Sequence, residues 1–261
     1  MIAAGVSPEW LLLRAPADTA ARSDELAERL ARRLAPDSGL VIHDLGGGSG
    51  AMGRWLAPWL PVPQHWVVHD RDPDLLELAV ADAPDPISVT VEARRSDITR
   101  LDRVDLTGAS LITASALLDL LTADELVRIL RVCARLPMLL ALTVVGRVTL
   151  SPADALDARI GEAFNAHQQR DRLLGPDAVA AAVGELRGTG AELVVRPSPW
   201  RLDAAHADLT AEWFGGWVAA ACEQEPALAA HAGAYRDRRL AQAAAGELAV
   251  TVDHADLLVL P

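Results

Sequence analysis

The chain has 261 residues, of which 51% are hydrophobic and 23% are charged, so one or two globular domains are expected and extended disorder is excluded. Acidic residues outnumber basic ones by 36 to 24, and the resulting net charge of −12 disfavours binding to nucleic acid. All 24 basic residues are arginine, which excludes Schiff-base chemistry and a phosphate-binding P-loop, because both need lysine.

The N-terminal segment and the cysteines give no sign of export or of redox chemistry. The first apolar run follows no basic region and is interrupted by Pro8 and Glu9, so no secretory signal is expected. No window approaches the roughly 20 apolar residues of a membrane span. Cys133 and Cys222 lie far apart, lack metal-ligand spacing and are expected to be buried thiols. These patterns predict a cytoplasmic protein that has no membrane segment and no metal site.

Strand-like and helix-like segments alternate along the first 145 residues. Ser23 is a typical helix N-cap, and the apolar spacing after it predicts a short amphipathic helix that ends before Pro36. Further strands are predicted at residues 40–45, 66–69, 87–91, 111–113 and 138–145, and helices at 52–60, 73–81 and 123–134. Strands separated by helices indicate a parallel sheet with helices on both faces.

The second half of the chain departs from this simple alternation. Its predicted elements are a polar helical insertion at 151–172, a helix at 176–186, a strand at 191–196, a helical stretch at 206–245 and a last strand at 255–260. The helical stretch is expected to break near Pro226. Since no repeat or linker is visible, we expect an N-terminal helical segment, 1–38, and one α/β domain, 39–261, with insertions near 151–172 and 206–245.

A glycine-rich loop is the sharpest motif in the sequence. It reads Asp44-Leu45-Gly46-Gly47-Gly48-Ser49-Gly50 and lies between a predicted strand and a predicted helix. Glycines let a ligand press against the backbone there and allow positive φ angles without strain. Asp44 is placed to orient the turn or to accept a hydrogen bond from a ligand amine. Gly48, Gly50 and Gly53 also satisfy GxGxxG, which keeps a dinucleotide site as an alternative.

The acidic residue followed by GxGxG resembles the first motif of the class I S-adenosylmethionine-dependent methyltransferases. The resemblance continues, in family order, through His69-Asp70-Arg71-Asp72-Pro73, Arg95-Ser96-Asp97-Ile98 and Thr113-Ala114-Ser115-Ala116. It implies a Rossmann-like seven-stranded sheet with helices on both faces, preceded by an N-terminal helical segment and carrying a helical insertion after strand five. The cofactor it implies is S-adenosyl-L-methionine, with S-adenosyl-L-homocysteine as product.

Individual positions receive cofactor roles through the same resemblance. It assigns Asp70 to the ribose hydroxyls, with Arg71 beside it, and Asp97 and Ile98 to the adenine. The Ala114 backbone and Ser115 lie at the border of cofactor and substrate. The cofactor-binding loop comprises Asp44, Gly46, Gly48 and Gly50. Purely structural roles are the alternative, because Asp70 and Asp72 can cap the helix that begins at Pro73 and Asp97 can close a turn.

The N-terminal segment is similar to the leading helices that cover the pocket in many small-molecule members of the family. Arg14 or Arg22 would then pair with the cofactor carboxylate, and we select Arg14, although either can be an ordinary surface arginine. Trp200, Trp213, Phe214 and Trp217 either line a pocket or, as we prefer, pack in the core. His254 and Asp256 are expected to form a turn before the last strand.

The acceptor side is expected in the 151–172 insertion, which follows the fifth strand. Phe164, His167 and Gln168 share one helical face and Asn165 lies in the neighbouring row, so these four are candidate substrate-binding residues unless the helix is simply solvated. His167 is the first candidate for a catalytic base. Asp119 is the second, although it can instead cap the helix after Thr122.

These observations predict methyl transfer from S-adenosylmethionine to a small-molecule acceptor by in-line displacement. Two alternatives stay open: an NAD(P)-dependent oxidoreductase, and a partner subunit that binds the cofactor without transferring the methyl group. The sequence names neither the acceptor nor the atom that is methylated, and it leaves open both the use of a general base and the choice between monomer and homodimer.

Overall fold

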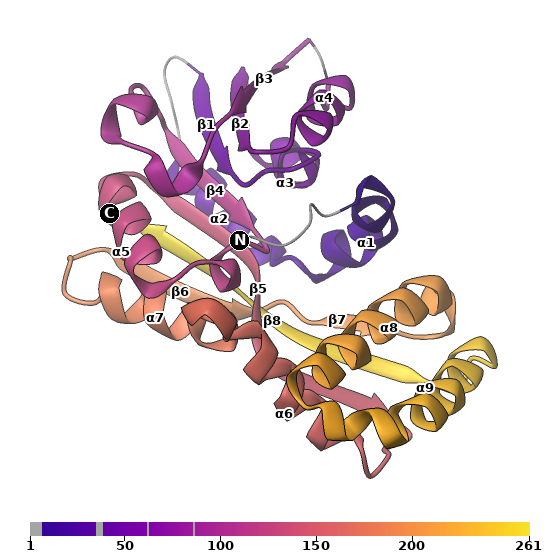
Figure 1. Cartoon of the computed structure of the whole chain (residues 1–261). Coiled ribbons are helices and arrows are strands. Elements are labelled where there is room, and N and C mark those ends of the chain that lie inside the picture. Colours follow the sequence, from indigo (N-terminus) through magenta and orange to yellow (C-terminus); the bar gives the residue numbers. More distant parts are fainter. Residues whose placement is uncertain (1–6, 35–38, 62, 86) are drawn as a thin grey trace.

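The computed structural model describes residues 7–34, 39–61, 63–85 and 87–261, and a single β-sheet lies at its centre (Figure 1). The strands are β1 (Leu40–Leu45), β2 (Gln64–Asp70), β3 (Val89–Arg95), β4 (Leu111–Ser115), β5 (Met138–Ser151), β6 (Glu192–Pro197), β7 (Trp200–Leu202) and β8 (Ala249–Leu260). Their order is β3-β2-β1-β4-β5-β8-β6, and β7 pairs with β8 outside this path. Strands β1 to β5 are parallel, whereas β8 runs antiparallel to its three neighbours. The strand order reverses between β1 and β4, where open α/β sheets bind their ligands.

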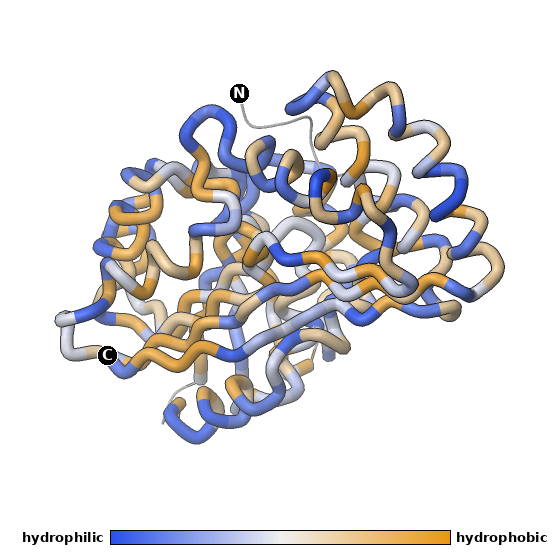
Figure 2. Tube along the Cα trace, turned by 90° about the horizontal axis from the view of Figure 1, so that it is seen from below, coloured by the Kyte–Doolittle hydropathy of each residue, from blue (hydrophilic) through white to orange (hydrophobic). Residues whose placement is uncertain are grey.

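Helices cover both faces of this sheet, as the sequence predicts. They are α1 (Pro8–Ala21), α2 (Asp24–Arg33), α3 (Ala51–Leu56), α4 (Pro73–Ala81), α5 (Ala123–Cys133), α6 (Asp157–Gln168), α7 (Ala178–Leu186), α8 (Ala207–Gln224) and α9 (Ala229–Ala244). Side chains alternate between the faces of a strand, so Leu111 packs in one core with α2 and α3 while Ile112 packs in another with α5 and α7. The hydrophobic tube segments of Figure 2 follow these strands.

A third core lies where β5 and β8 extend beyond the central sheet. Val148 to Ser151 pair with Ala249 to Val252, and β7 pairs with the same part of β8. Helices α6, α8 and α9 pack on this extension (Figure 1), and Phe214, Trp217 and Tyr235 are fully buried beneath them. The aromatic residues of α8 therefore serve packing, which was the preferred expectation.

The extension is the main departure from the predicted elements. β5 continues to Ser151 rather than ending at 145, and β8 begins at Ala249 rather than at 255. His254 and Asp256 consequently lie inside a buried strand and form no turn, because antiparallel pairing to β5 carries the backbone past the apolar run. Cys133 is buried as expected, whereas Cys222 is partly exposed.

Asp256 connects three segments that are distant in sequence. Its Oδ1 accepts a hydrogen bond of 2.8 Å from the backbone of Leu142, which has a φ of 53° at an irregularity in β5. Its Oδ2 accepts a second bond of 2.8 Å from the backbone of Ser23, the N-cap of α2. Burial raises the pKa of Asp256. One carboxyl group therefore fixes both the bulge of β5 and the start of α2.

We expect Asp256→Ala to lower the free energy of unfolding by about 2 to 3 kcal/mol, because two buried N–H groups lose their acceptor. Urea denaturation measures the change. The matched control is Asp253→Ala on the same strand, whose carboxylate pairs with the exposed Arg147 and should contribute less than about 1 kcal/mol. Equal losses in the two variants would show that the backbone acceptor role is unimportant.

Candidate functional site

The glycine loop connects β1 to α3 at the point where the strand order reverses. Gly46, Gly48 and Gly50 have φ angles of 64°, 52° and 79°, values at which a side chain would be strained. Gly47 is needed for a different reason, since its N–H donates to the His69 carbonyl at 3.0 Å and a Cβ there would lie 2.5 Å from Asp44 Oδ2. The loop is thus folded directly onto the carboxylate at the end of β1.

Asp44 is fully buried beneath this loop. Thr113 on β4 donates a hydrogen bond of 2.7 Å to its Oδ1. Burial raises the pKa of Asp44 to about 6, against the opposing effects of the Thr113 hydroxyl and the Arg22 guanidinium. Asp44 and Thr113 are register partners on the parallel strands β1 and β4, so their side chains lie on the same face of the sheet.

Asp70, at the end of β2, also holds the loop. Its Oδ2 accepts from the backbone of Gly48 at 2.9 Å, and its Oδ1 accepts from the backbone of Asp72 at 3.0 Å. Asp72 caps α4 by accepting from the backbone of Asp74. The capping role that the sequence offered to both carboxylates therefore belongs to Asp72, and Asp70 faces the glycine loop.

Arg22 lies in the turn between α1 and α2 and is 4% exposed. Its Nη2 donates to Ser115 Oγ at 3.1 Å, and its guanidinium carbon lies 5.6 Å from the centre of the Trp55 ring. Burial lowers its pKa from the ordinary arginine value. The sequence offers both Arg14 and Arg22 for the cofactor carboxylate, and Arg14 is the one predicted from it. The signal that favours Arg22 is its place directly before the N-cap Ser23, because Asp256 holds that residue against the sheet.

Arg14 is already engaged. It makes two hydrogen bonds to Asp18, of 2.9 and 3.1 Å, and stacks over the Trp200 ring at 5.0 Å. Trp200 Nε1 donates to the same carboxylate at 2.9 Å and its ring lies 5.3 Å from that of His254. Helix α1 is thereby fixed to β7 and β8, and its Leu11 lies 3.7 Å from the position of a Cβ on Gly48.

The segment that follows β4 contacts the glycine loop at Gly46. Ala116 has a φ of 51°, and Leu117 reaches to 2.9 Å from the position of a Cβ on Gly46. Asp119 follows in the 3-10 turn η4 (Leu118–Leu120) and is 7% exposed. Thr122 caps α5 together with Glu125, so Asp119 is not the cap of that helix.

Four buried polar atoms around the loop have no hydrogen-bond partner within the residues that the structure describes. They are Arg22 Nε, Arg22 Nη1, Asp44 Oδ2 and Asp119 Oδ1, and we refer to them as the open polar atoms. Buried polar atoms are normally paired, because losing water without a replacement costs about 1 to 3 kcal/mol. The set contains atoms of a positively charged arginine and of two acidic side chains, and a zwitterionic ligand needs partners of both signs.

The hydrogen bonds of the predicted adenine segment are made largely to neighbouring residues of the protein. Asp97 caps the 3-10 turn η2 (Ile98–Arg100) and accepts hydrogen bonds from Thr99 and Arg71. Burial pushes its pKa upward, but these hydrogen bonds prevail and hold it at about 2. Ile98 packs into the core that contains α5.

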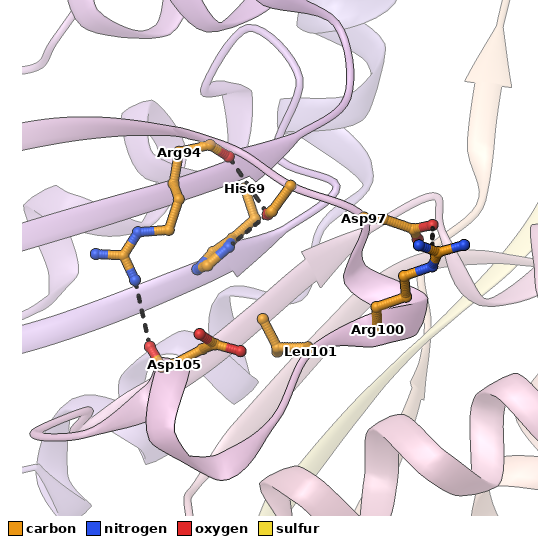
Figure 3. Close-up of a pocket in the computed structure, with 7 residues that line it drawn as sticks. His69, Arg94, Asp97, Arg100, Leu101 and Asp105 are labelled. Carbon is orange, nitrogen blue, oxygen red and sulfur yellow. Dashed lines mark hydrogen bonds and ion pairs between the residues drawn. The ribbon is translucent and has the colours of Figure 1, made fainter.

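A cavity of about 210 Å³ lies beside this segment (Figure 3). Its walls come from His69, Arg94, Ser96, Asp97, Arg100, Leu101 and Asp105. His69 Nε2 lies 2.9 Å from His43 Nδ1, and His69 Nδ1 lies 2.9 Å from Ser96 Oγ. Because both ring nitrogens of His69 are paired, the cavity wall is a satisfied hydrogen-bond chain.

The predicted acceptor residues of α6 point in different directions. Asn165 Nδ2 donates to the Gly146 carbonyl on β5 at 2.7 Å, whereas His167 Nε2 lies 3.1 Å from Glu223 on α8. Phe164 packs beside the third core and Gln168 lies against Gly175. Among the positions that the structure describes, no group of three or more His, Cys, Asp or Glu side chains is placed to hold a metal ion.

Strand order, glycine loop and acidic strand ends define the fold of the class I S-adenosylmethionine-dependent methyltransferases. The cyclopropane synthase MmaA2 from Mycobacterium tuberculosis has a similar structure, with a TM-score of 0.52, 14% identity, and coverage of 98% of this chain and 95% of that one. A methyltransferase from Geobacter sulfurreducens, solved with S-adenosyl-L-homocysteine, has a TM-score of 0.48 and 17% identity over all of both chains. Neither a protein-family model nor a curated protein sequence matches the chain.

We expect Gly47→Ala to lower the free energy of unfolding by about 2 kcal/mol, because the added methyl group would overlap Asp44 and Val68. Gly184→Ala is the matched control, since a Cβ there meets nothing within 4 Å and α7 should gain about 0.5 to 1 kcal/mol. Urea denaturation of both variants measures the difference. A Gly47→Ala protein as stable as the parent would contradict the close approach of the loop.

The histidine pair predicts a pH dependence of stability. Burial lowers the pKa of His43 and of His69 to about 4, whereas the unfolded chain protonates near the ordinary value of 6.5. The unfolded state therefore binds more protons between pH 6.5 and 4, and the folded state loses stability as the pH falls through this range.

His69→Gln removes one of these sites, so its stability should fall less on acidification. Between pH 7 and pH 5, we expect the free energy of unfolding of the parent to fall by about 1 to 2 kcal/mol more than that of the variant. Urea denaturation at both pH values measures it. Asp44 and Asp119, whose pKa values are raised to about 6, act in the opposite direction but are common to both proteins. Parallel losses in the two proteins would show that His69 is not held neutral.

Proposed function

We propose that this protein transfers a methyl group from S-adenosylmethionine to a small-molecule acceptor. The observation that carries the proposal is the pair of buried, opposite charges formed by Arg22 and Asp44, whose open polar atoms lie at the carboxyl ends of β1 and β4. Each group acts electrostatically on the other. An amino-acid moiety would supply a carboxylate to Arg22 and an ammonium group to Asp44, and S-adenosylmethionine ends in such a moiety.

The remaining cofactor contacts follow the sequence prediction. Asp70 would accept the ribose hydroxyls while it holds Gly48, and Gly46, Gly48 and Gly50 would allow the ligand to approach the backbone. Further contacts are proposed for Arg71 beside the ribose, for Asp97 and Ile98 at the adenine, and for Ala114 and Ser115 at the end of β4. Arg22 takes the role at the carboxylate for which the sequence selects Arg14, because Arg14 pairs with Asp18. The hydrogen bond from Arg22 to Ser115 supports the assignment of Ser115, because it joins the two proposed contacts.

A pyrophosphate fits this loop less well than an amino acid does. Asp44 Oδ2 lies directly under Gly47, where a dinucleotide would place its phosphates, and two negative charges in a buried site repel each other strongly. Gly53, the third glycine of the GxGxxG pattern, packs against Trp66 and supports the junction of helix and strand. These contacts favour S-adenosylmethionine over a nicotinamide dinucleotide.

When bound, the cofactor supplies an electrophilic methyl group on a sulfonium, and the residues of the chain orient the reactants and exclude water. Helix α1 would act as the lid of the predicted 1–38 segment, since Leu11 lies against the glycine loop. The domain comprises 39–261 with its two helical insertions. Residues 1–6 and 35–38 lie outside the described part of the chain.

Two residues are proposed to take a proton from the acceptor, namely His167 and Asp119. His167 pairs with Glu223 at the junction of α6 and α8, and Phe164, Asn165 and Gln168 would bind the acceptor from the same insertion. Asp119 has an open oxygen, and the charge of Arg14 on α1 acts on its carboxyl group. Burial raises its pKa to about 6, which suits a group that must accept a proton near neutral pH.

A small molecule is the proposed acceptor because the net charge of −12 repels nucleic acid. No helix among the residues placed by the structure is long and apolar enough to cross a membrane. A cytoplasmic location and a possible homodimer complete the proposal.

The first test is calorimetric titration with S-adenosylmethionine, S-adenosylhomocysteine and NAD in parallel. We expect the first two to bind and NAD to give no signal. Arg22→Gln should weaken both cofactor forms about tenfold or more, because a hydrogen bond between charged groups contributes about 1.5 to 3 kcal/mol.

Arg33→Gln at the exposed end of α2 is the matched control, and it should change either affinity less than about twofold. Binding of NAD without either cofactor form would overturn the proposed function. Unchanged affinity in Arg22→Gln would remove Arg22 from the site.

A further inference from the structure

Three of the four open polar atoms belong to Arg22 and Asp44, which are proposed to bind the amino-acid end of the cofactor. The fourth, Asp119 Oδ1, has no partner in that proposal. Asp119 lies two residues after Leu117, which covers Gly46, and its Oδ1 is buried. Arg14 on α1 acts on its charge, and Leu11 of the same helix lies against Gly48. Asp119 thus belongs to the segment after β4 whose Leu117 contacts the glycine loop at Gly46, and it is within electrostatic reach of α1, whose Leu11 contacts the loop at Gly48.

No charge in the described surroundings of Asp119 neutralises it directly. Arg14 is bound bidentately by Asp18, so only part of its charge reaches Asp119. On the elements packed against η4, the ionisable side chains are engaged elsewhere: Asp177 in η6 (Gly175–Asp177) with Gln169, Glu185 in α7 with Arg131, and Arg147 in β5 with Asp253. A buried carboxylate in this position favours a cationic ligand.

The proposed function fixes where such a cation would be. With the amino-acid moiety held by Arg22 and Asp44 and the ribose by Asp70, the sulfur that joins them would lie beside the glycine loop, between these anchors. Leu117 and Leu11 border Gly46 and Gly48 of this loop. We propose, on the basis of that function, that Asp119 is the counter-ion of the sulfonium and lets the site distinguish S-adenosylmethionine from S-adenosylhomocysteine.

The consequence is a site that prefers fresh cofactor over spent cofactor. S-adenosylmethionine carries a fixed positive charge on sulfur, whereas the sulfur of S-adenosylhomocysteine is neutral. Attraction between unit charges grows as the local dielectric constant falls, so a buried carboxylate discriminates between the two ligands more strongly than an exposed one. Once the methyl group has left, Asp119 loses its partner, and the product is held less tightly than the substrate form.

The test compares proton release and affinity for the two cofactor forms. With a pKa of about 6, Asp119 is about half protonated at pH 6, and a nearby sulfonium should displace roughly half a proton. Titrations at pH 6 in two buffers of different ionisation enthalpy measure this release. We expect S-adenosylmethionine to release more protons than S-adenosylhomocysteine, since any response of Asp44 to the shared amino group cancels in the comparison.

Asp119→Asn should abolish that difference and weaken S-adenosylmethionine about tenfold while changing S-adenosylhomocysteine less than about twofold. Asp124→Asn, an exposed carboxylate on α5, removes the same charge and should leave the preference intact. Equal proton release with the two ligands in the parent protein would overturn the proposal, even if Asp119→Asn failed to fold. Failure of both ligands to bind the parent would instead overturn the proposed function.

Discussion

The carboxyl group of Asp256 is the contact on which the geometry of the candidate site depends. It accepts from Ser23 and from Leu142, so it fixes the start of α2 and the bulge of β5 with one buried side chain. Arg22 directly precedes Ser23 and is held beside Ser115 in consequence. The position of Arg22 in the site therefore depends on Asp256, which lies on the last strand of the sheet and more than 200 residues later in the chain.

The same region carries buried charged groups whose hydrogen bonding is incomplete within the described residues. Asp44 and Asp119 have pKa values raised to about 6 by burial, and the pKa of Arg22 is lowered. Such groups reduce the stability of the free protein, because their desolvation is only partly offset by neighbours. A ligand that brings a carboxylate, an ammonium group and a sulfonium would compensate all three, which links the cost in stability to cofactor binding.

Much of the fold could be predicted because local signals coincide with it. The helix at 73–81 and the strand at 40–45 match the structure residue for residue, since Pro73 and Gly46 mark their boundaries. The extension of β5 and β8 was not predictable from residue patterns. Its strands continue through Gly146 and Arg147, and only antiparallel pairing between distant segments keeps them extended. The predicted turn at His254 and Asp256 is wrong for that reason, because both residues lie inside β8.

The sequence by itself determined the alternation of strands and helices, the glycine loop and the acidic strand ends, because these depend on periodicity and on the conformational freedom of glycine. Tertiary structure decided which charged side chains meet there. Arg14 and Arg22 both lie in the N-terminal helical segment, yet Asp18 pairs with the first, whereas the second faces Ser115. Partner choice between distant side chains depends on packing, which no local pattern encodes.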